Sequence, residues 1–200
     1  MSDDGVIYKR RGANLPHWTR EGAVYAVTFR LADSLPEAAV EKLRREARLL
    51  QRKGDCQYAP LSGEEQRRLL RLMSEKYQDL LDAGQGACLL CQDACAEIVA
   101  TALQHFDGKR YRLWAWCVVP NHVHVVVQPA AGESLSAILH SWKSFTAKKI
   151  NKLLGRSGAL WQPESFDHFV RDDQDLQHCV RYVWHNPEKA GLRDWKWRGR

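Results

Sequence analysis

Two histidines, His122 and His124, lie one residue apart in the segment PNHVHVVVQP, which spans residues 120–129. In a strand, residues i and i+2 point to the same face of the sheet, so both imidazoles are expected opposite Val123 and Val125. Neutral imidazole is a good ligand for divalent metals. The pair therefore predicts half of a metal site, although two hydrogen-bonded histidines on an amphipathic strand would give the same pattern.

A second group of reactive side chains lies near the C-terminus, where Tyr182 and Asn186 are four residues apart and His178 precedes them by four. On a helix this spacing places successive members one turn apart on one side. Tyrosine can attack as a nucleophile, but its free pKa of about 10 calls for an electrophile polarised by a metal. Taken alone, Tyr182 is better explained as a core-facing aromatic.

The pattern of apolar residues predicts strands alternating with helices. An N-terminal irregular arm precedes the first strand, and Ser34 with Glu37 has the spacing of a capping box. Pro187 is expected to stop the last helix just after Asn186. The expected strands are 23–32, 110–120, 122–129 and one within 159–172, and the expected helices are 34–53, 63–84, 93–108, 134–155 and 172–186.

This order predicts an α+β fold in which an antiparallel sheet carries helices on one face. Strand, helix, strand, strand, helix, strand is the ferredoxin-like β-α-β-β-α-β plan. The chain of 200 residues suits a single domain over 1–200. The two charged helices near the N-terminus would form an insertion at about 36–83, and the terminal helix would carry Tyr182.

The composition favours an anionic partner. Lysine and arginine number 30 against 24 acidic residues, so the net charge is +6, and nucleic acid is the leading candidate. The N-terminal segment has no apolar stretch typical of a signal peptide, and no apolar run is long enough to cross a bilayer. We therefore expect a soluble, cytoplasmic protein with no membrane partner.

Six cysteines are present, and three of them form the pattern C-x-x-C-x-x-x-C at Cys88, Cys91 and Cys95. A structural zinc site normally needs a second, well-spaced pair of ligands, and the sequence offers none. Cys91 and Cys95 are four residues apart on an expected helix, so packing in the core is the favoured interpretation, and the role of the three thiols stays open.

Several separated blocks taken together resemble one family. The blocks PNHVHVVV, LHSWKSFTAKKIN, LWQPESFDHFVRD and YVWHNPEKAGL occur in this order. They are similar to those of the REP-associated tyrosine transposases, relatives of the IS200-like, single-tyrosine transposases of the HUH endonuclease superfamily. The resemblance extends over about residues 12–192.

The resemblance implies a mechanism and a set of roles. His122 and His124 match the metal-binding histidines, Tyr182 matches the tyrosine that attacks DNA, and Asn186 matches a polar third ligand. His185 and His178 remain alternatives for that third ligand. The implied metal is Mg²⁺ or Mn²⁺, the implied product is a covalent 5′-phosphotyrosine, and the implied partner is single-stranded or hairpin DNA, bound by a monomer or a homodimer.

Basic residues near these blocks could hold phosphates, although a solvated helix face explains them almost as well; they are Lys143, Lys148, Lys149, Arg171 and Arg181. Two functions are alternatives to the nuclease. A histidine-triad nucleotide hydrolase would need a third histidine where this chain has Val126. A domesticated relative would keep DNA recognition and lack cleavage.

Overall fold

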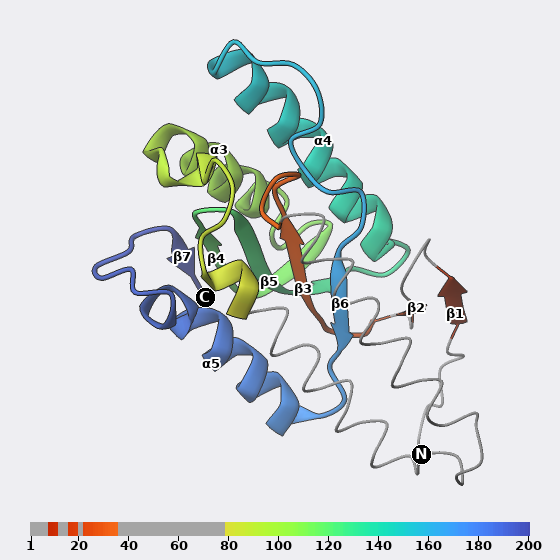
Figure 1. Ribbon diagram of the computed structural model, residues 1–200. Coiled ribbons are helices and arrows are strands. Elements are labelled where there is room, and N and C mark those ends of the chain that lie inside the picture. Colours follow the sequence, from red (N-terminus) through yellow and green to blue (C-terminus); the bar gives the residue numbers. More distant parts are fainter. Residues whose placement is uncertain (1–7, 12–15, 20–21, 36–78) are drawn as a thin grey trace, which may run out of the picture. The chain divides into compact units, whose positions relative to one another are not determined.

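The computed structural model describes residues 8–11, 16–19, 22–35 and 79–200 (Figure 1). The chain divides into two compact units, one of Met1–Ala32 with Leu89–Arg200 and one of Asp33–Cys88. In the second unit, the backbone N–H of Ala87 donates to the Asp33 carboxylate at 2.8 Å. The expected helices at 34–53 and 63–84 lie almost wholly outside the described residues, so the insertion stays a prediction.

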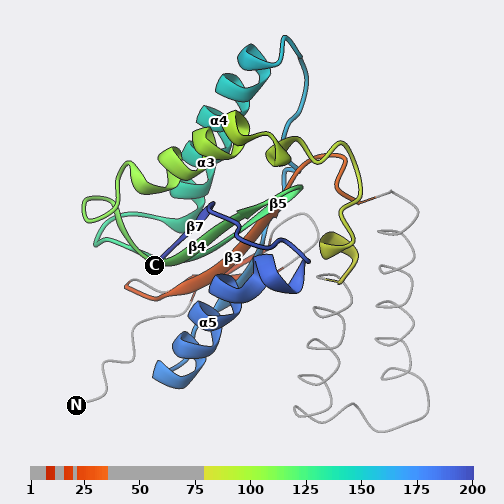
Figure 2. The ribbon, with the colours of Figure 1, turned by 90° about the vertical axis from the view of Figure 1, so that its left-hand side faces the viewer.

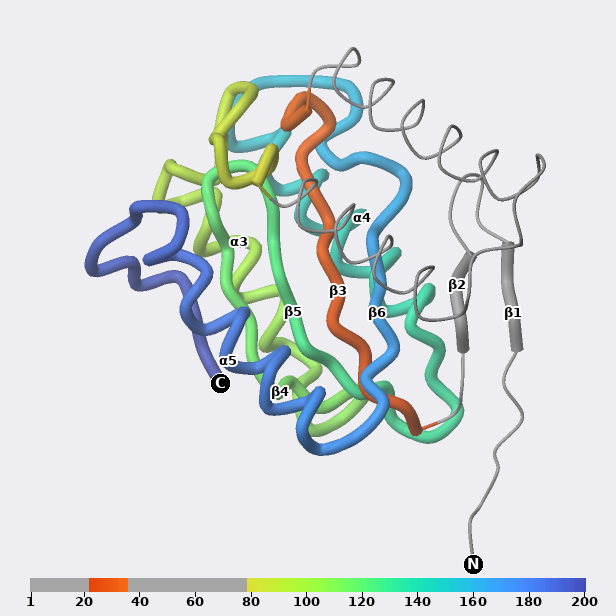
Figure 3. Tube along the Cα trace, turned by 60° about the horizontal axis from the view of Figure 1, so that its bottom comes forward, coloured from red at the N-terminus to blue at the C-terminus, as the bar shows by residue number. Residues whose placement is uncertain are grey.

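The first unit is built on a five-stranded antiparallel sheet with the order β6-β3-β5-β4-β7 (Figure 3). Separately, two short strands near the N-terminus pair with each other antiparallel. The strands are β1 (Tyr8–Arg11), β2 (Pro16–Thr19), β3 (Tyr25–Arg30), β4 (Tyr111–Val119), β5 (His122–Pro129), β6 (Phe166–Phe169) and β7 (Arg198–Gly199). The strands expected at 23–32, 110–120 and 122–129 are confirmed.

Two helices cover one face of this sheet, α3 (Asp93–Gln104) and α4 (Leu135–Leu153), and a single turn η1 (Leu89–Cys91) precedes α3 (Figure 2). The core on this side contains the odd-numbered valines of β5, which pack with apolar residues of α3 and α4 such as Leu103 and Ile138. Strand alternation therefore places Val123, Val125 and Val127 on the face that these helices cover.

The third long helix, α5 (Asp173–Lys189), lies on the opposite face of the sheet, over β4 and β5 (Figures 2 and 3). A second apolar cluster joins Val126 to Cys117 and to Val183 of α5. The expectation of helices on one face only is therefore wrong. Strands β4 and β5 are apolar on both faces, so the second face also needs a cover.

The helix α5 begins where the sequence predicts but ends later than expected. Asp172 caps its start by accepting a hydrogen bond from the N–H of Asp175 at 2.8 Å. The helix does not stop at Asn186: it contains Pro187 and continues to Lys189. Proline removes the N–H that would otherwise bond the Val183 carbonyl, and the helix continues for only two residues beyond it.

Buried hydrogen bonds hold α4 in place on the sheet. The indole N–H of Trp142 donates to the Tyr111 hydroxyl at 2.9 Å. The Thr146 hydroxyl donates to the Trp142 carbonyl at 2.7 Å and accepts from the indole of Trp161 at 2.9 Å. These partners satisfy polar groups that lie deep inside the larger core. Among the described residues, no helix combines the length and apolarity needed to cross a membrane.

Candidate active site

The two histidines of β5 lie side by side beneath α5. Both side chains are buried, with exposures of 1% for His122 and 2% for His124. Their Nε2 atoms are 2.8 Å apart, and the ring planes are perpendicular with centroids 4.6 Å apart. They share the sheet face of Val126, which packs against α5, so the expectation that both rings project together is confirmed.

The outer nitrogen of each ring has a polar partner of its own. The Nδ1 atom of His122 is 2.7 Å from the side-chain oxygen of Asn121, and a carbonyl oxygen only accepts, so Nδ1 carries the proton. In the neutral ring, His122 Nε2 is then a bare lone pair. The Nδ1 atom of His124 is 2.8 Å from the Thr28 hydroxyl on the paired strand. Outer partners of this kind orient metal-binding imidazoles.

The electrostatics of the site keep both imidazoles neutral. Burial lowers the pKa of His122 well below its usual value, and the adjacent His124 adds to this. Burial also lowers the pKa of His124, to about 3, and the positive charge of Lys189 acts in the same direction. Because a ring must be neutral to offer a lone pair, the pair is in the form that a metal requires.

Tyr182 comes to this pair from α5. Its ring meets the His124 ring edge-on, with centroids 5.5 Å apart and an interplanar angle of 84°. The ammonium group of Lys189, the last residue of α5, lies 5.8 Å from the centre of the same phenol ring. The chain thus places a tyrosine, a histidine pair and one cation together.

Asn186 is buried one turn beyond Tyr182, with an exposure of 1%. Neither the oxygen nor the nitrogen of its amide has a hydrogen-bond partner among the described residues. A buried amide without partners costs about 1–3 kcal/mol, so it calls for a water, an ion or a ligand as partner. Within the first unit, its oxygen and the two imidazoles are candidate ligands for a divalent ion.

The alternative third ligands lie elsewhere on α5. The His185 side chain is 64% exposed and faces Glu188 at 4.0 Å, and His178 is also exposed. Eight residues turn a helix by about 80° beyond two full turns, so His178 and Asn186 do not share one face. The structure thus separates three candidates that spacing alone left equivalent.

Three residues around the site were not among those expected from the sequence. Thr28 lies on β3, almost a hundred residues from its partner His124, and no sequence signal could have found it. Asn121 directly precedes His122, and its amide side chain in the turn was a usable signal. Lys189 follows the tyrosine by two helical turns, a spacing that predicts proximity once the helix is known to extend beyond Pro187.

The basic residues expected to hold phosphates fall on two sides of the sheet. Lys143, Lys148 and Lys149 belong to α4, on the face away from the histidines. The Lys143 ammonium donates to the Pro163 carbonyl at 2.9 Å, and burial, then the nearby Arg30, lower its pKa to about 8 against an opposing effect of Glu164. Arg171 and Arg181 are exposed on the α5 side.

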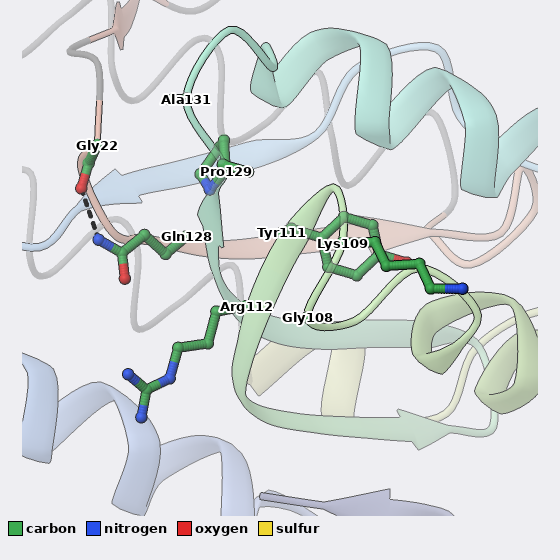
Figure 4. A pocket seen from close by; sticks show the side chains of 9 residues that line it. Gly22, Gly108, Lys109, Tyr111, Arg112, Gln128, Pro129 and Ala131 are labelled. Carbon is green, nitrogen blue, oxygen red and sulfur yellow. Dashed lines mark hydrogen bonds between the residues drawn. The ribbon is translucent and has the colours of Figure 1, made fainter.

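Two of the surface cavities in the described part of the chain lie near elements of the site. One of about 350 Å³ lies at the far end of β5 from His122, where Gln128 donates to the Gly22 carbonyl at 2.8 Å (Figure 4). The other, an open groove of about 520 Å³, runs along α5 and is lined by two tryptophans and two arginines among others: Trp114, Trp184, Arg181 and Arg200. We refer to it as the α5 groove.

The cysteines of the C-x-x-C-x-x-x-C pattern are thiols, and their surroundings differ. Cys95 is fully buried within α3 and belongs to the larger core, as expected. Cys91 is exposed in η1, which precedes the helix, so the expectation that it also packs in a helical core is wrong.

Comparisons with known proteins agree with the geometry. Residues 90–186 match the model of a family described as transposase IS200 like. A REP-associated tyrosine transposase of Escherichia coli (strain K12) is 29% identical over 90 residues, which cover 42% of this chain and 52% of that protein. A Haemophilus influenzae relative assigned to the same transposases is 28% identical over 95 residues, 40% of this chain and 54% of its own. The chain spans about half the length of these curated relatives.

A solved structure has a similar fold. It is a REP-associated tyrosine transposase bound to a REP hairpin, with a TM-score of 0.50 and 16% identity, and the match covers 94% of this chain and 82% of that chain. At this identity the likeness concerns the fold alone. Together the comparisons confirm the resemblance that the sequence blocks predicted.

Proposed function

Since this chain resembles the REP-associated tyrosine transposases and matches the IS200-like family over residues 90–186, we propose that it cleaves and rejoins single-stranded DNA. Tyr182 is the nucleophile, and His122, His124 and Asn186 hold one divalent metal, Mg²⁺ or Mn²⁺. The observation that carries the proposal is the contact of the Tyr182 ring with His124, 5.5 Å between centroids. The buried amide of Asn186, one turn further along α5, supports it.

In the proposed cleavage, the Tyr182 phenol oxygen attacks a backbone phosphorus atom. A bond forms between this oxygen and phosphorus, and the bond from phosphorus to the 3′ oxygen breaks. The phenolic proton is lost, and the departing 3′ oxygen takes a proton to become a hydroxyl. The strand is left as a 5′-phosphotyrosine, and attack by a 3′-hydroxyl reverses the step without ATP.

The residues around the phenol have separate tasks in this scheme. The Lys189 ammonium near the ring favours the charged phenolate that attack requires. Thr28 and Asn121 orient the imidazoles so that each Nε2 lone pair is presented. Mg²⁺ or Mn²⁺, when bound, would neutralise and orient the scissile phosphate.

The proposed partner is hairpin or other single-stranded DNA. The net charge of +6 and the α5 groove support it, because arginines bind phosphates and tryptophans stack on bases. Arg181 lines this groove and Arg171 lies just before the start of α5. We therefore assign both arginines to the proposed DNA-binding surface. We propose a cytoplasmic protein that acts as a monomer or a homodimer.

We also propose a ferredoxin-like unit at the centre of the fold, within a single domain over 1–200. The strand order β6-β3-β5-β4 and the placement of α3 and α4 on one face support this arrangement. In this description, β7 and the tyrosine helix α5 are additions to the unit, and the segment at about 36–83 is an insertion.

The decisive experiment uses a labelled single-stranded hairpin flanked by unpaired nucleotides, incubated with the full chain and Mn²⁺. We expect a covalent protein–DNA product that is absent in Tyr182→Phe. A variant at another tyrosine, Tyr8→Phe on strand β1, serves as the control and should still form the product. Hairpin binding by the wild type with no covalent product would instead support a non-cleaving, domesticated DNA-binding protein.

The histidine variants test the role of the metal. We expect His122→Ala and His124→Ala to abolish cleavage while hairpin binding survives, because the metal serves the chemistry more than the affinity. Cleavage and binding are measured on the same labelled hairpin. Equal loss of both in each variant, with the fold intact by circular dichroism, would contradict this assignment.

A further inference from the structure

A second group of metal-ligating side chains lies at the start of α5, outside the candidate active site. It consists of His168 on β6 with Asp175 and Cys179 on α5. One potential ligand atom from each residue lies within 4.8 Å of the other two. The His168 Nε2 atom is 2.9 Å from the Asp175 Oδ2 atom, and the Cys179 sulfur is 3.8 Å from Oδ1.

The spacing of these atoms matches the requirements of a tetrahedral ion. With bonds of about 2.0 Å to nitrogen and oxygen and about 2.3 Å to sulfur, ligand atoms in a tetrahedron stand about 3.3–3.6 Å apart. The sulfur–oxygen separation of 3.8 Å is already close to this. The separation of 2.9 Å is from His168 Nε2 to the other carboxylate oxygen, Oδ2, so His168 would exchange this hydrogen bond for a bond to the ion.

The carboxylate of Asp175 is already oriented by the backbone. Its Oδ2 atom accepts a hydrogen bond from the N–H of Arg171 at 3.1 Å, whereas Oδ1 faces the thiol. The cap of the helix is provided separately by Asp172. Asp175 therefore has one oxygen, Oδ2, held by the main chain and by His168, and another, Oδ1, directed at Cys179. With Oδ1 bound to the ion, the N–H of Arg171 would remain as the outer partner of the carboxylate.

The exposure of the three side chains and the types of their ligand atoms indicate which ion they would bind. His168 is 37% exposed and Asp175 23% exposed at the side chain, so an ion and a water molecule can enter, whereas Cys179 is buried. A thiolate, an imidazole and one carboxylate form a soft, mixed donor set that favours Zn²⁺ and disfavours Mg²⁺, which prefers six oxygen ligands.

We propose that His168, Asp175 and Cys179 form a zinc site, completed by one water molecule, that ties the edge strand β6 to the helix bearing Tyr182. On binding, the Cys179 thiol gives its proton to solvent and the sulfur becomes a thiolate ligand. The site is structural, because its three ligands are distinct from the candidate active-site residues and Cys179 precedes Tyr182 by about one turn of α5. It rests on this geometry alone and holds whether or not the chain cleaves DNA.

The test uses Co²⁺ as the probe, added to the full chain after removal of metals with a chelator. Cobalt bound by a thiolate gives an intense charge-transfer absorption, which an imidazole and amide site lacks. We expect this absorption to saturate at one equivalent and to be displaced by Zn²⁺. It should persist in His122→Ala, so that the two metal sites are distinguished and failure of one assignment leaves the other standing.

Variants at the proposed ligands complete the experiment. Cys179→Ser should abolish the charge-transfer absorption, and His168→Gln should weaken Zn²⁺ binding by at least about tenfold. Cys91→Ser and His178→Gln, at exposed positions on η1 and α5, are the matched controls and should behave like the wild type. If the wild type shows no thiolate absorption, or if Cys179→Ser retains it, the zinc site is overturned.

Discussion

Two buried polar side chains, Asn186 and Thr28, have proposed roles that single substitutions can separate from their contribution to stability. The Asn186 amide is buried and has no hydrogen-bond partner among the described residues, whereas the Thr28 hydroxyl lies against His124. Apolar replacement should therefore affect the two positions in opposite ways. The metal-free protein is the reference for stability in both cases.

Replacement of Asn186 by leucine should stabilise the metal-free protein and weaken its binding of the metal ion. The two side chains have similar volumes, and the change removes a buried amide whose desolvation is uncompensated, so we expect the free energy of unfolding to rise by about 1 kcal/mol. Urea unfolding in chelator measures this, and calorimetric titration with Mn²⁺ measures affinity. A less stable variant that keeps its Mn²⁺ affinity would show that the amide is structural.

Replacement of Thr28 by valine should loosen the orientation of His124. The hydroxyl is 2.8 Å from Nδ1 of the ring, and loss of such an outer partner typically lowers metal affinity by about 10–100-fold. We expect a weaker response to Mn²⁺ in DNA cleavage, with hairpin affinity unchanged. Thr28→Ser keeps the hydroxyl and is the control; if serine fails as badly as valine, the effect comes from packing.

At the scale of elements, the strand with the histidines is positioned by what packs on each of its faces. Its valines face α3 and α4, and its histidines face α5. The alternation along β5 can be predicted from the sequence, since a strand has a period of two. The sheet face against which α5 packs cannot be predicted in this way, because β4 is apolar at successive positions and offers both of its faces to a partner.

The helix α4 depends on its buried hydrogen bonds, and Thr146 tests this. Thr146→Val preserves the shape but leaves the Trp161 N–H without its acceptor, so we expect a loss of about 1–3 kcal/mol in the free energy of unfolding. Thr146→Ser, which retains the hydroxyl, should lose less. Both variants are measured by urea unfolding. If Thr146→Val and the wild type were equally stable, the Thr146 hydroxyl would not contribute to the stability of the core.

At the scale of the molecule, positive charge is present on both sides of the sheet, and this raises the question of which side meets DNA. The lysines of α4 lie away from the histidines, and Arg181 lies in the α5 groove. The proposed cleavage by Tyr182 would require the DNA strand to pass on the α5 side. We therefore expect the arginines of that side to carry the phosphate contacts.

The salt dependence of hairpin binding distinguishes the two sides. Affinity should fall as salt rises, with a logarithmic slope of about −0.7 per phosphate contacted. Arg181→Gln should make this slope shallower by about 0.7, the value of one phosphate contact. Lys148→Gln on α4 should leave the slope unchanged. Filter binding at several salt concentrations measures both. A reduced slope for Lys148→Gln would place the DNA on the other face.

The sequence by itself determined the local pattern: the His-x-His strand, the tyrosine helix and the order of elements, because periodicity and turn residues act over a few neighbours. Only the tertiary structure decided that Thr28 and Lys189 join the site, that α5 covers the second face and that Asn186, not His178 or His185, is the buried polar group. These facts depend on how segments far apart in the chain pack. Burial and the helix rotation are properties of that packing, which spacing along the chain does not contain.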